Sequence, residues 1–293
     1  MSGRRPVRLI RWLLGLLGAG LLAGLALLAF AWWEARQPPT VREAYVPVPG
    51  WPAGEPSRTV LLISDTHVHA PEMPPERLAG IVRQLNEVKP DLVLLAGDFL
   101  SERQRAGQPY GAEQTVAALA GLRATFGVAA VLGNHDHWSD PAGFRRAFTA
   151  HGIPLLANRA IRRGPFIVGG VDDEYTHHDN LPATLRAMAA LGPGVRLLFT
   201  HTPDVIPKLK EPVAAIFAGH THCGQVSPPP IGPIVTMSRY GRRFACGEIH
   251  DAGKTIFVGA GVGTSGLPIR FGAPPDVWLV RFGPNRAAPH WRE

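Results

Sequence analysis

One stretch constrains the fold of this chain more than any other: residues 131–138, with the sequence VLGNHDHW. An apolar run from Val128 to Leu132 ends at Gly133, and an asparagine, a histidine, an aspartate and a second histidine follow at once. This order predicts a buried strand that delivers polar side chains at its carboxyl end, where open α/β sheets bind ligands. Burying an amide, two imidazoles and a carboxylate is costly unless something pairs them, and a metal ion would do so.

Four further apolar runs end in the same way. Each predicts another strand with a polar side chain at its end: residues 60–64 before Asp65 and His67, residues 92–97 before Asp98, residues 196–200 before His201, and residues 214–219 before His220 and His222. A single Asp or His in such a place is more often an ordinary core or surface residue. Five runs in the same register favour one shared functional site.

In this order, the motifs resemble the motif set of the calcineurin-like metallophosphoesterases. The matching residues are Asp65-x-His67, Gly97-Asp98, Gly133-Asn134-His135-Asp136, His201 and Gly219-His220-x-His222. Further along, Gly224-Gln225, Pro268-Ile-Arg-Phe271 and Pro274-Pro275 are similar to the exported or membrane-anchored phosphodiesterase branch. The resemblance covers residues 58 to about 282. It implies an α/β fold of two stacked mixed β-sheets flanked by helices, an α-β-β-α sandwich with metals at the strand ends.

The polar side chains at the strand ends number seven, too many for one tetrahedral ion but enough for two ions that share a bridging carboxylate. Oxygen and imidazole ligands suit Mn, Fe or Zn, and leave the identity of the two divalent ions open. The resemblance implies the allocation. Asp65, His67 and His222 would hold one ion, Asn134, His201 and His220 would hold the other, and Asp98 would bridge them.

His135 is the remaining candidate for catalysis. The resemblance implies that it approaches the oxygen of the leaving group, where a protonated imidazole would stabilise the developing alkoxide. Asp136 is a second catalytic candidate, because it would either orient His135 or cap the loop, and the sequence leaves both roles open.

The sequence offers only weak candidates for substrate binding. Arg270 matches a family position by motif alone. His177 and His178 lie in the polar segment 172–179, follow no apolar strand and match no family motif, so they belong to a solvated loop or contact the substrate.

The amino-terminal segment predicts a membrane anchor. Four arginines precede an uncharged run from Trp12 to Trp33, which is long enough to cross a bilayer as a helix and has tryptophans at both edges. The basic residues place residues 1–11 in the cytoplasm, so the rest of this single-pass protein of the inner, cytoplasmic membrane would be extracytoplasmic. A signal peptide cleaved near residues 29–31 is the alternative, and the sequence leaves cleavage open.

Beyond the anchor, we expect a linker over residues 34–57, a catalytic domain over 58–283 and a tail over 284–293. Alternation of Ala44, Val46 and Val48 indicates an edge strand within the linker. In the domain, helices are expected over residues 74–88, 112–123 and 181–191 and after an Asp140 cap, and short strands over 154–157 and 165–171. Whether Cys223 and Cys246 form a bridge is left open, as is the oligomeric state.

The leading interpretation is a membrane-anchored phosphodiesterase that uses two metal ions to generate the hydroxide that attacks phosphorus. Its substrate would be a phosphate ester, including the lipid-linked kind. An alternative is a pyrophosphate hydrolase of a lipid-linked nucleotide sugar of the UDP-2,3-diacylglucosamine type, although that reaction is cytoplasmic. A non-catalytic metal-binding membrane protein is disfavoured because no ligand position is missing. The net charge of +7 is partly due to the arginines before the span, so we expect no specific nucleic-acid partner.

Overall fold

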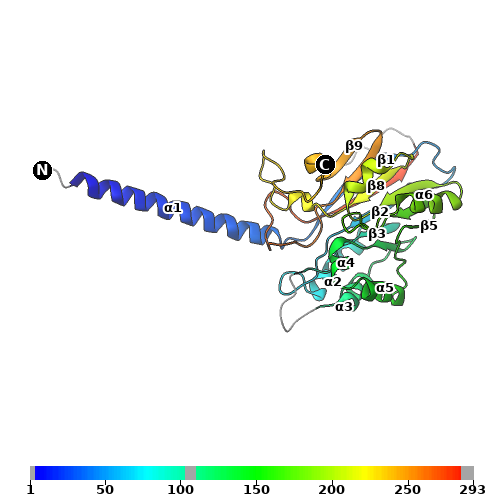
Figure 1. Ribbon diagram of the computed structural model, residues 1–293, viewed down its shortest axis with the longest axis horizontal. Helices are drawn as coiled ribbons and strands as arrows, with labels where there is room; N and C mark the ends of the chain where they lie inside the picture. Colours follow the sequence, from blue (N-terminus) through cyan, green and yellow to red (C-terminus); the bar gives the residue numbers. More distant parts are fainter. Residues whose placement is uncertain (1–3, 103–109, 285–293) are drawn as a thin grey trace.

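The computed structural model describes residues 4–102 and 110–284 of the chain (Figure 1). Two β-sheets pack face to face, helices flank them, and helix α1 (Arg4–Glu34) projects from one end of the domain. The predicted α/β sandwich is therefore confirmed. The expected cytoplasmic segment and carboxyl-terminal tail lie partly outside the described residues, which omit 1–3 and 285–293.

The first sheet has the strand order β1-β11-β2-β3-β4. Its strands are β1 (Thr40–Pro47), β2 (Arg58–Ile63), β3 (Leu92–Ala96), β4 (Val128–Val131) and β11 (Asp276–Gly283). β2, β3 and β4 run parallel, because α2 (Pro75–Asn86) and α3 (Ala112–Leu119) connect them as crossover helices. The carboxyl ends of these three strands consequently meet at one edge of the sheet.

The second sheet has the order β5-β6-β7-β8-β10-β9. Its strands are β5 (Arg159–Arg163), β6 (Phe166–Gly170), β7 (Val195–Phe199), β8 (Ala215–Ala218), β9 (Gly247–Asp251) and β10 (Lys254–Val258). The four central strands are parallel, and the edge strands β5 and β9 are antiparallel to their neighbours. The five apolar runs of the sequence are thus β2, β3 and β4 in one sheet and β7 and β8 in the other.

The prediction of a strand over residues 154–157 is wrong. Leu155 forms only an isolated bridge with Ala130, flanked by hydrogen bonds of 3.0 and 2.7 Å at the edge of β4. Pro154 has no amide hydrogen to extend that ladder. The strand begins instead at Arg159, and its sequence RAIRR lacks an apolar run because β5 is an exposed edge strand.

Apolar side chains fill the space between the sheets, with Leu62, Leu94 and Phe217 at the centre of this core. Helices α2, α3 and α5 (Pro141–Ala150) pack on the outer face of the first sheet, and α6 (Leu181–Ala190) with the short helix η1 (Pro203–Lys208) packs on the second. The predicted Asp140 cap is present, because its carboxylate accepts the amide hydrogen of Gly143 at 2.8 Å. Each sheet is therefore packed on both faces, and this packing fixes the strand ends that carry the polar side chains.

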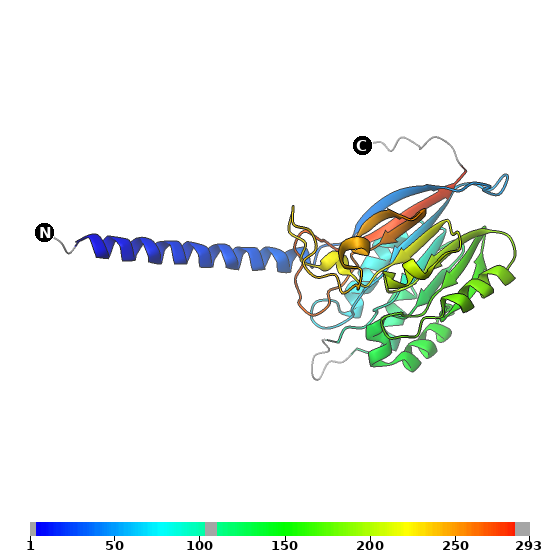
Figure 2. The same cartoon turned by 45° about the horizontal axis from the view of Figure 1, so that its top comes forward.

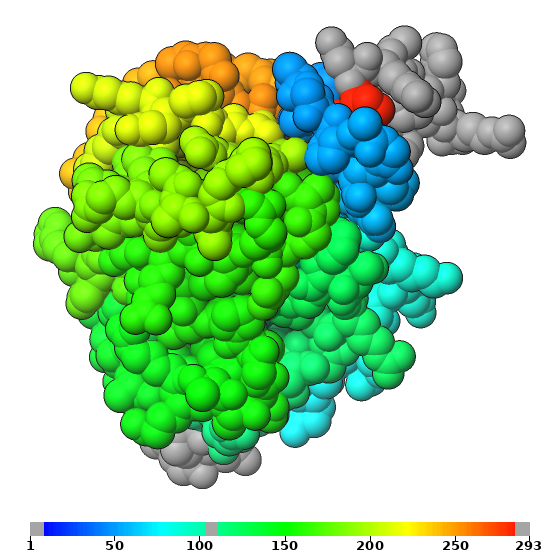
Figure 3. All heavy atoms as spheres, turned by 90° about the vertical axis from the view of Figure 1, so that its right-hand side faces the viewer, coloured from blue at the N-terminus to red at the C-terminus, as the bar shows by residue number. Residues whose placement is uncertain are grey.

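The segment 34–57, expected as a linker, packs on the domain. Strand β1 pairs in parallel with β11 at the sheet edge, and Ala44 and Val46 are buried, as their alternation predicted. Val48 and Trp51 are buried beyond it. Figure 3, which views the face opposite α1, shows this blue segment lying against the rest of the domain.

Helix α1 is long and apolar enough over Leu9–Glu34 to cross a membrane. Its last turn is fixed to a loop of residues 263–273, which we term the anchor loop (Figure 2). The amide hydrogen of Arg270 bonds the carbonyl of Ala31 at 2.9 Å, and that of Gly272 bonds the Glu34 carboxylate at 2.9 Å. Helix and domain therefore meet through specific contacts.

Candidate metal centre

The strand ends of both sheets converge on one site, and the backbone there is unusual. Asp65, His67, Asp98, His220 and His222 all have positive φ, between 43° and 71°. Residues other than glycine adopt this left-handed conformation at a cost, and it is concentrated at functional sites. Each of the three motifs that contain these residues, after β2, β3 and β8, thus turns sharply as it leaves its strand.

Two glycines of the motifs let the loops approach closely. A Cβ on Gly97 would lie 2.5 Å from the amide nitrogen of Gly133, and one on Gly133 would lie 2.2 Å from a carboxylate oxygen of Asp98. Both distances are far below van der Waals contact, so side chains are excluded at these positions. The Gly-Asp and Gly-Asn pairs of the sequence are explained by this contact between neighbouring strand ends.

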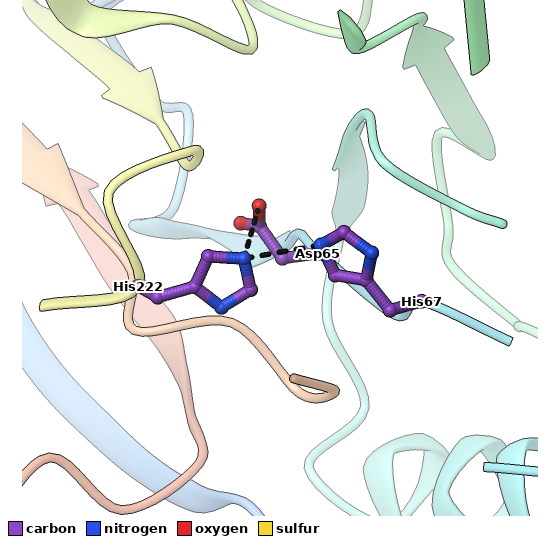
Figure 4. A group of neighbouring side chains, drawn as sticks. All are labelled: Asp65, His67 and His222. Carbon is purple, nitrogen blue, oxygen red and sulfur yellow. Dashed lines mark hydrogen bonds and ion pairs between the residues drawn. The ribbon is translucent and has the colours of Figure 1, made fainter. Parts of the chain in front are cut away.

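Asp65, His67 and His222 form the first group of ligand-type side chains (Figure 4). The Nε2 atoms of His67 and His222 lie 3.1 Å apart, and Nε2 of His222 lies 3.4 Å from Oδ1 of Asp65. The amide hydrogen of His220 bonds both oxygens of Asp65 at 3.1 Å and so fixes the carboxylate. Two imidazole nitrogens and a carboxylate therefore point at a common centre.

Asp98, His201 and His220 form the second group, and Asn134 joins it. Nδ1 of His201 donates to the carbonyl of Ala96 at 2.8 Å, which turns Nε2 toward the site. That Nε2 lies 3.1 Å from Oδ1 of Asn134, 3.2 Å from Oδ2 of Asp98 and 3.1 Å from Nδ1 of His220. A hydrogen bond from the far nitrogen to a backbone carbonyl is typical of metal-binding histidines.

Asp98 lies between the two groups. Its Oδ2 is 3.5 Å from Nε2 of His67 and 3.2 Å from Nε2 of His201, while its Oδ1 accepts the amide hydrogen of His135 at 2.9 Å. Burial raises the pKa of this carboxyl, but the neighbouring His201 outweighs burial and holds it well below its usual range. An ionised carboxylate in this position can be shared by two cations.

Burial sets the charge of three of the imidazoles. It lowers the pKa of His67 to about 3 and that of His220 to about 4, and it lowers the pKa of His222 as well. These rings are therefore neutral at pH 7, which is the form that binds metals. Burial also lowers the pKa of His201, but the Asp98 carboxylate outweighs it and leaves that pKa raised. The three neutral imidazoles, together with His201, the carboxylates and an amide oxygen in two adjoining groups, fit a pair of divalent ions.

His135 stands beside the ligands and is 12% exposed. Its Nε2 lies 3.8 Å from Oδ2 of Asp98, and its Nδ1 lies 3.1 Å from Oε2 of Glu102. Burial lowers the pKa of His135, but Glu102 more than offsets this and leaves it raised. The ring therefore lines the open side of the site, and the Glu102 carboxylate lies beside its Nδ1.

Glu102 was not identified from the sequence. Its other oxygen accepts the amide hydrogen of Gly266 at 2.9 Å, so it links His135 to the anchor loop. Burial raises the pKa of Glu102, but its contact with His135 outweighs this and the pKa is lowered. The residue follows no apolar strand and its partners are far away in the chain, so no local pattern indicated it.

The Asp136 carboxylate bonds the backbone of two loops. It accepts the amide hydrogens of Phe99 at 2.9 Å, Leu100 at 3.3 Å and Gly133 at 2.9 Å. These contacts join the loop after β3 to the start of α4 (Asn134–Ser139). They favour the capping role that the sequence left open for Asp136 beside a role in orienting His135.

The three weak candidates for substrate binding do not line the open side of the site. Arg270 is fully buried behind His222, and its guanidinium donates to the carbonyls of Ala260, Gly261, Gly263 and Ala273. This favours a structural role over a substrate contact. His177 and His178 are exposed in the loop after β6, where the ring of His178 stacks on His137 at 3.9 Å.

A cleft of about 590 Å³ opens over the metal-ligand groups. Its floor includes Asp98, Asn134 and His222, and its walls are largely apolar: Trp138, Tyr175, Val226, Ile234, Val235, Met237 and Leu267. A disulfide joins Cys223 to Cys246 and so ties the turn after His222 to the start of β9. The two cysteines, whose pairing the sequence left open, therefore form a disulfide.

Comparison with known proteins agrees with this geometry. A model of the calcineurin-like phosphoesterase family matches residues 58–224. The metallophosphoesterase YkuE of Bacillus subtilis is 31% identical over 210 residues, which are 69% of this chain and 71% of YkuE. YkoQ of the same organism, also named a metallophosphoesterase, is 28% identical over 227 residues, covering 74% of this chain and 81% of YkoQ.

Two more distant proteins are also similar. A zebrafish (Danio rerio) transmembrane protein with a metallophosphoesterase domain is 26% identical over 267 residues, which are 83% of this chain but 57% of that protein. Among solved structures, the NAD nucleotidase of Haemophilus influenzae superposes with a TM-score of 0.45 at 15% identity, covering 70% of this chain and 45% of the nucleotidase.

Proposed function

Since the chain belongs to the calcineurin-like phosphoesterase family and is a hydrolase of phosphoester bonds, we propose that it is a membrane-anchored phosphodiesterase with two divalent metal ions. The observation that carries the proposal is the pair of ligand groups that adjoin at Asp98. When bound, the ions would supply Lewis acidity at phosphorus and a hydroxide nucleophile at neutral pH.

The distances support one allocation of the ligands. Asp65, His67 and His222 would hold the first ion, Asn134, His201 and His220 would hold the second, and Asp98 would be shared by both. The described side chains offer no thiolate near this set, because both cysteines are paired. Mn, Fe and Zn all remain compatible with these oxygen and nitrogen ligands.

His135 is the proposed proton donor to the leaving group. It lines the cleft, adjoins a ligand without itself belonging to either three-residue group around Asp65 or Asp98, and has the Glu102 carboxylate 3.1 Å from its Nδ1. Glu102 would hold the ring so that Nε2 faces the substrate. A positioned imidazolium can then deliver its proton as the ester bond breaks.

The experiment that tests this function is metal analysis of the purified full chain together with a panel of phosphate mono-, di- and pyrophosphate esters. We expect two ions per chain and the highest kcat/KM on a diester. A preference for a lipid-linked nucleotide pyrophosphate would support the alternative hydrolase instead. Tight metal binding without hydrolysis of any ester would contradict the proposed activity.

We also propose that the catalytic domain lies on the extracytoplasmic side. The arginines at the start of α1, before its uncharged run, support this orientation, and so does the Cys223–Cys246 bridge, because disulfides persist in oxidising compartments. A carboxyl-terminal reporter that folds only after export should therefore be active, and a reporter that works only in the cytoplasm should be silent at the same point. The reverse result would overturn the orientation and favour the cytoplasmic pyrophosphate hydrolase.

A further inference from the structure

Exposed apolar side chains concentrate around the mouth of the cleft. Among the described residues outside α1, every exposed large apolar side chain lies there: Trp138, Tyr175, Ile231, Ile234, Val235, Met237 and Leu267. Five of them, Ile231, Ile234, Val235, Met237 and Leu267, are between 55% and 63% exposed and form what we term the apolar rim. Contiguous exposed apolar surface on a soluble face is uncommon and marks an interaction site.

The apolar rim lies at the base of α1. Leu267 belongs to the anchor loop, whose Arg270 amide bonds Ala31 and whose Phe271 ring lies 6.1 Å from that of Phe30. The other four rim residues belong to the segment 225–237, which Phe271 also holds. Figures 1 and 2 show both segments, yellow and brown, grouped where α1 meets the domain.

The attachment of the domain to the end of α1 places the apolar rim near the membrane interface. Trp32 and Trp33 are exposed at the end of the apolar helix, where indoles favour the membrane interface. The anchor loop, which carries Leu267, contacts Ala31 directly, so the apolar rim lies at the end of α1 that carries these tryptophans. Arg242 is exposed beside Ile231, whose carbonyl its guanidinium bonds at 2.7 Å, and its charge suits anionic headgroups.

The cleft is polar at its floor and apolar at its mouth, which suits a molecule with a polar head and an apolar tail. Metal-ligand side chains form its floor, and the rim residues Val235, Met237 and Leu267 form its mouth. A phosphate at the floor would therefore leave the rest of its molecule in apolar surroundings that continue toward the membrane. A phosphodiester with polar groups on both sides of phosphorus would gain no apolar burial from such a mouth.

We propose that the apolar rim sits in the headgroup layer of the bilayer that α1 spans, and that the cleft draws lipid phosphodiesters from that layer. The hydrolysis of lipid phosphodiesters rests on the proposed phosphodiesterase function, whereas the insertion of the apolar rim into the headgroup layer does not. The two parts are therefore measured separately.

The position of the apolar rim in the membrane is tested with spin labels on the full chain in vesicles of phosphatidylcholine and phosphatidylglycerol. The ratio of relaxation by dissolved oxygen to relaxation by a water-soluble nickel chelate should be higher for nitroxides on Val235→Cys and Leu267→Cys than for a label in water. Ala190→Cys is the control, because Ala190 is exposed on α6, at the end of the domain away from α1 (Figure 1). Labels at all three sites that respond to the nickel chelate alike would overturn the inference.

The use of lipid substrate is tested with two diesters that share a leaving group. Bis-p-nitrophenyl phosphate is offered in water, and dioleoylphosphatidyl-p-nitrophenol in vesicles, where water attacks phosphorus to give phosphatidic acid and p-nitrophenol. Ile231 belongs to the rim but does not line the cleft. Ile231→Glu should lower the vesicle rate about fivefold to tenfold, since one apolar anchor is replaced by a charge, and should leave the rate in water unchanged.

Ala190→Glu adds the same charge away from the rim and should change neither rate. Hydrolysis of the soluble diester but not of the lipid diester by the unmodified chain would overturn the lipid inference while the phosphodiesterase function stands. If neither diester is hydrolysed, the proposed function fails, and the label depths still decide where the rim sits.

Discussion

The His135→Ala variant should keep both metal ions and lose turnover of an alkyl phosphodiester by about two to four orders of magnitude, the usual contribution of a general acid. Its ring is absent from both groups around Asp65 and Asp98, so its removal leaves every proposed ligand in place. The loss arises because an alkoxide must depart without a proton. Metal content and kcat on the same preparation measure the two effects.

The leaving group provides the sharper test of His135. A p-nitrophenyl ester should suffer a smaller loss, because p-nitrophenolate needs little protonation. His137→Ala is the matched control, since His137 contacts Asp172 at 2.9 Å and does not line the cleft, and it should stay near full activity. Equal losses on both esters would argue against the leaving-group role, and loss of metal would make His135 a ligand.

The Asp98→Asn variant should lose affinity for both ions and with it nearly all activity. Its carboxylate lies within 3.5 Å of an imidazole from each group, so the change removes a negative charge that both cations would share. The effect should exceed the roughly 10- to 100-fold loss of metal affinity that follows removal of an outer-shell partner. Titration with each metal, followed by metal analysis, measures it.

Asn134→Ala is the comparison for Asp98→Asn. Its amide oxygen lies 3.1 Å from Nε2 of His201 in the second group, so this variant should weaken mainly one ion. The side chain of Asn at position 98 can still accept the His135 amide hydrogen, which preserves the loop. A wild-type chain that is fully active with a single ion would contradict the two-metal arrangement.

The strand ends of the site could be predicted from the sequence because their signal is local. Each apolar run and the polar residue after it are adjacent in the chain, so the run locates Asp65 or His201 without knowledge of its neighbours. The alternation of Ala44 and Val46 revealed β1 for the same reason. The parallel pairing of β2 with β3 followed from the helix between them.

The remaining features depend on contacts between distant parts of the chain. Glu102 receives a hydrogen bond from Gly266, 164 residues away, and Arg270 is explained only by the carbonyls that surround its guanidinium. The edge strands β5 and β9 carry charged residues because one side faces water, so their sequences lack the apolar pattern of the central strands. Such features are decided by packing, which no short pattern records.

The pairing of β1 with β11 also determines how the domain can exist free of its anchor. A chain begun at residue 58 would lack β1 and leave β11 as a bare edge, open to pairing with another molecule. A cut between Glu34 and Thr40 would instead keep the sheet whole and remove the contacts of Phe30, Ala31 and Glu34 with the anchor loop. Proteolytic shedding in that interval would therefore release an intact, diffusible hydrolase, now without its hold on the bilayer.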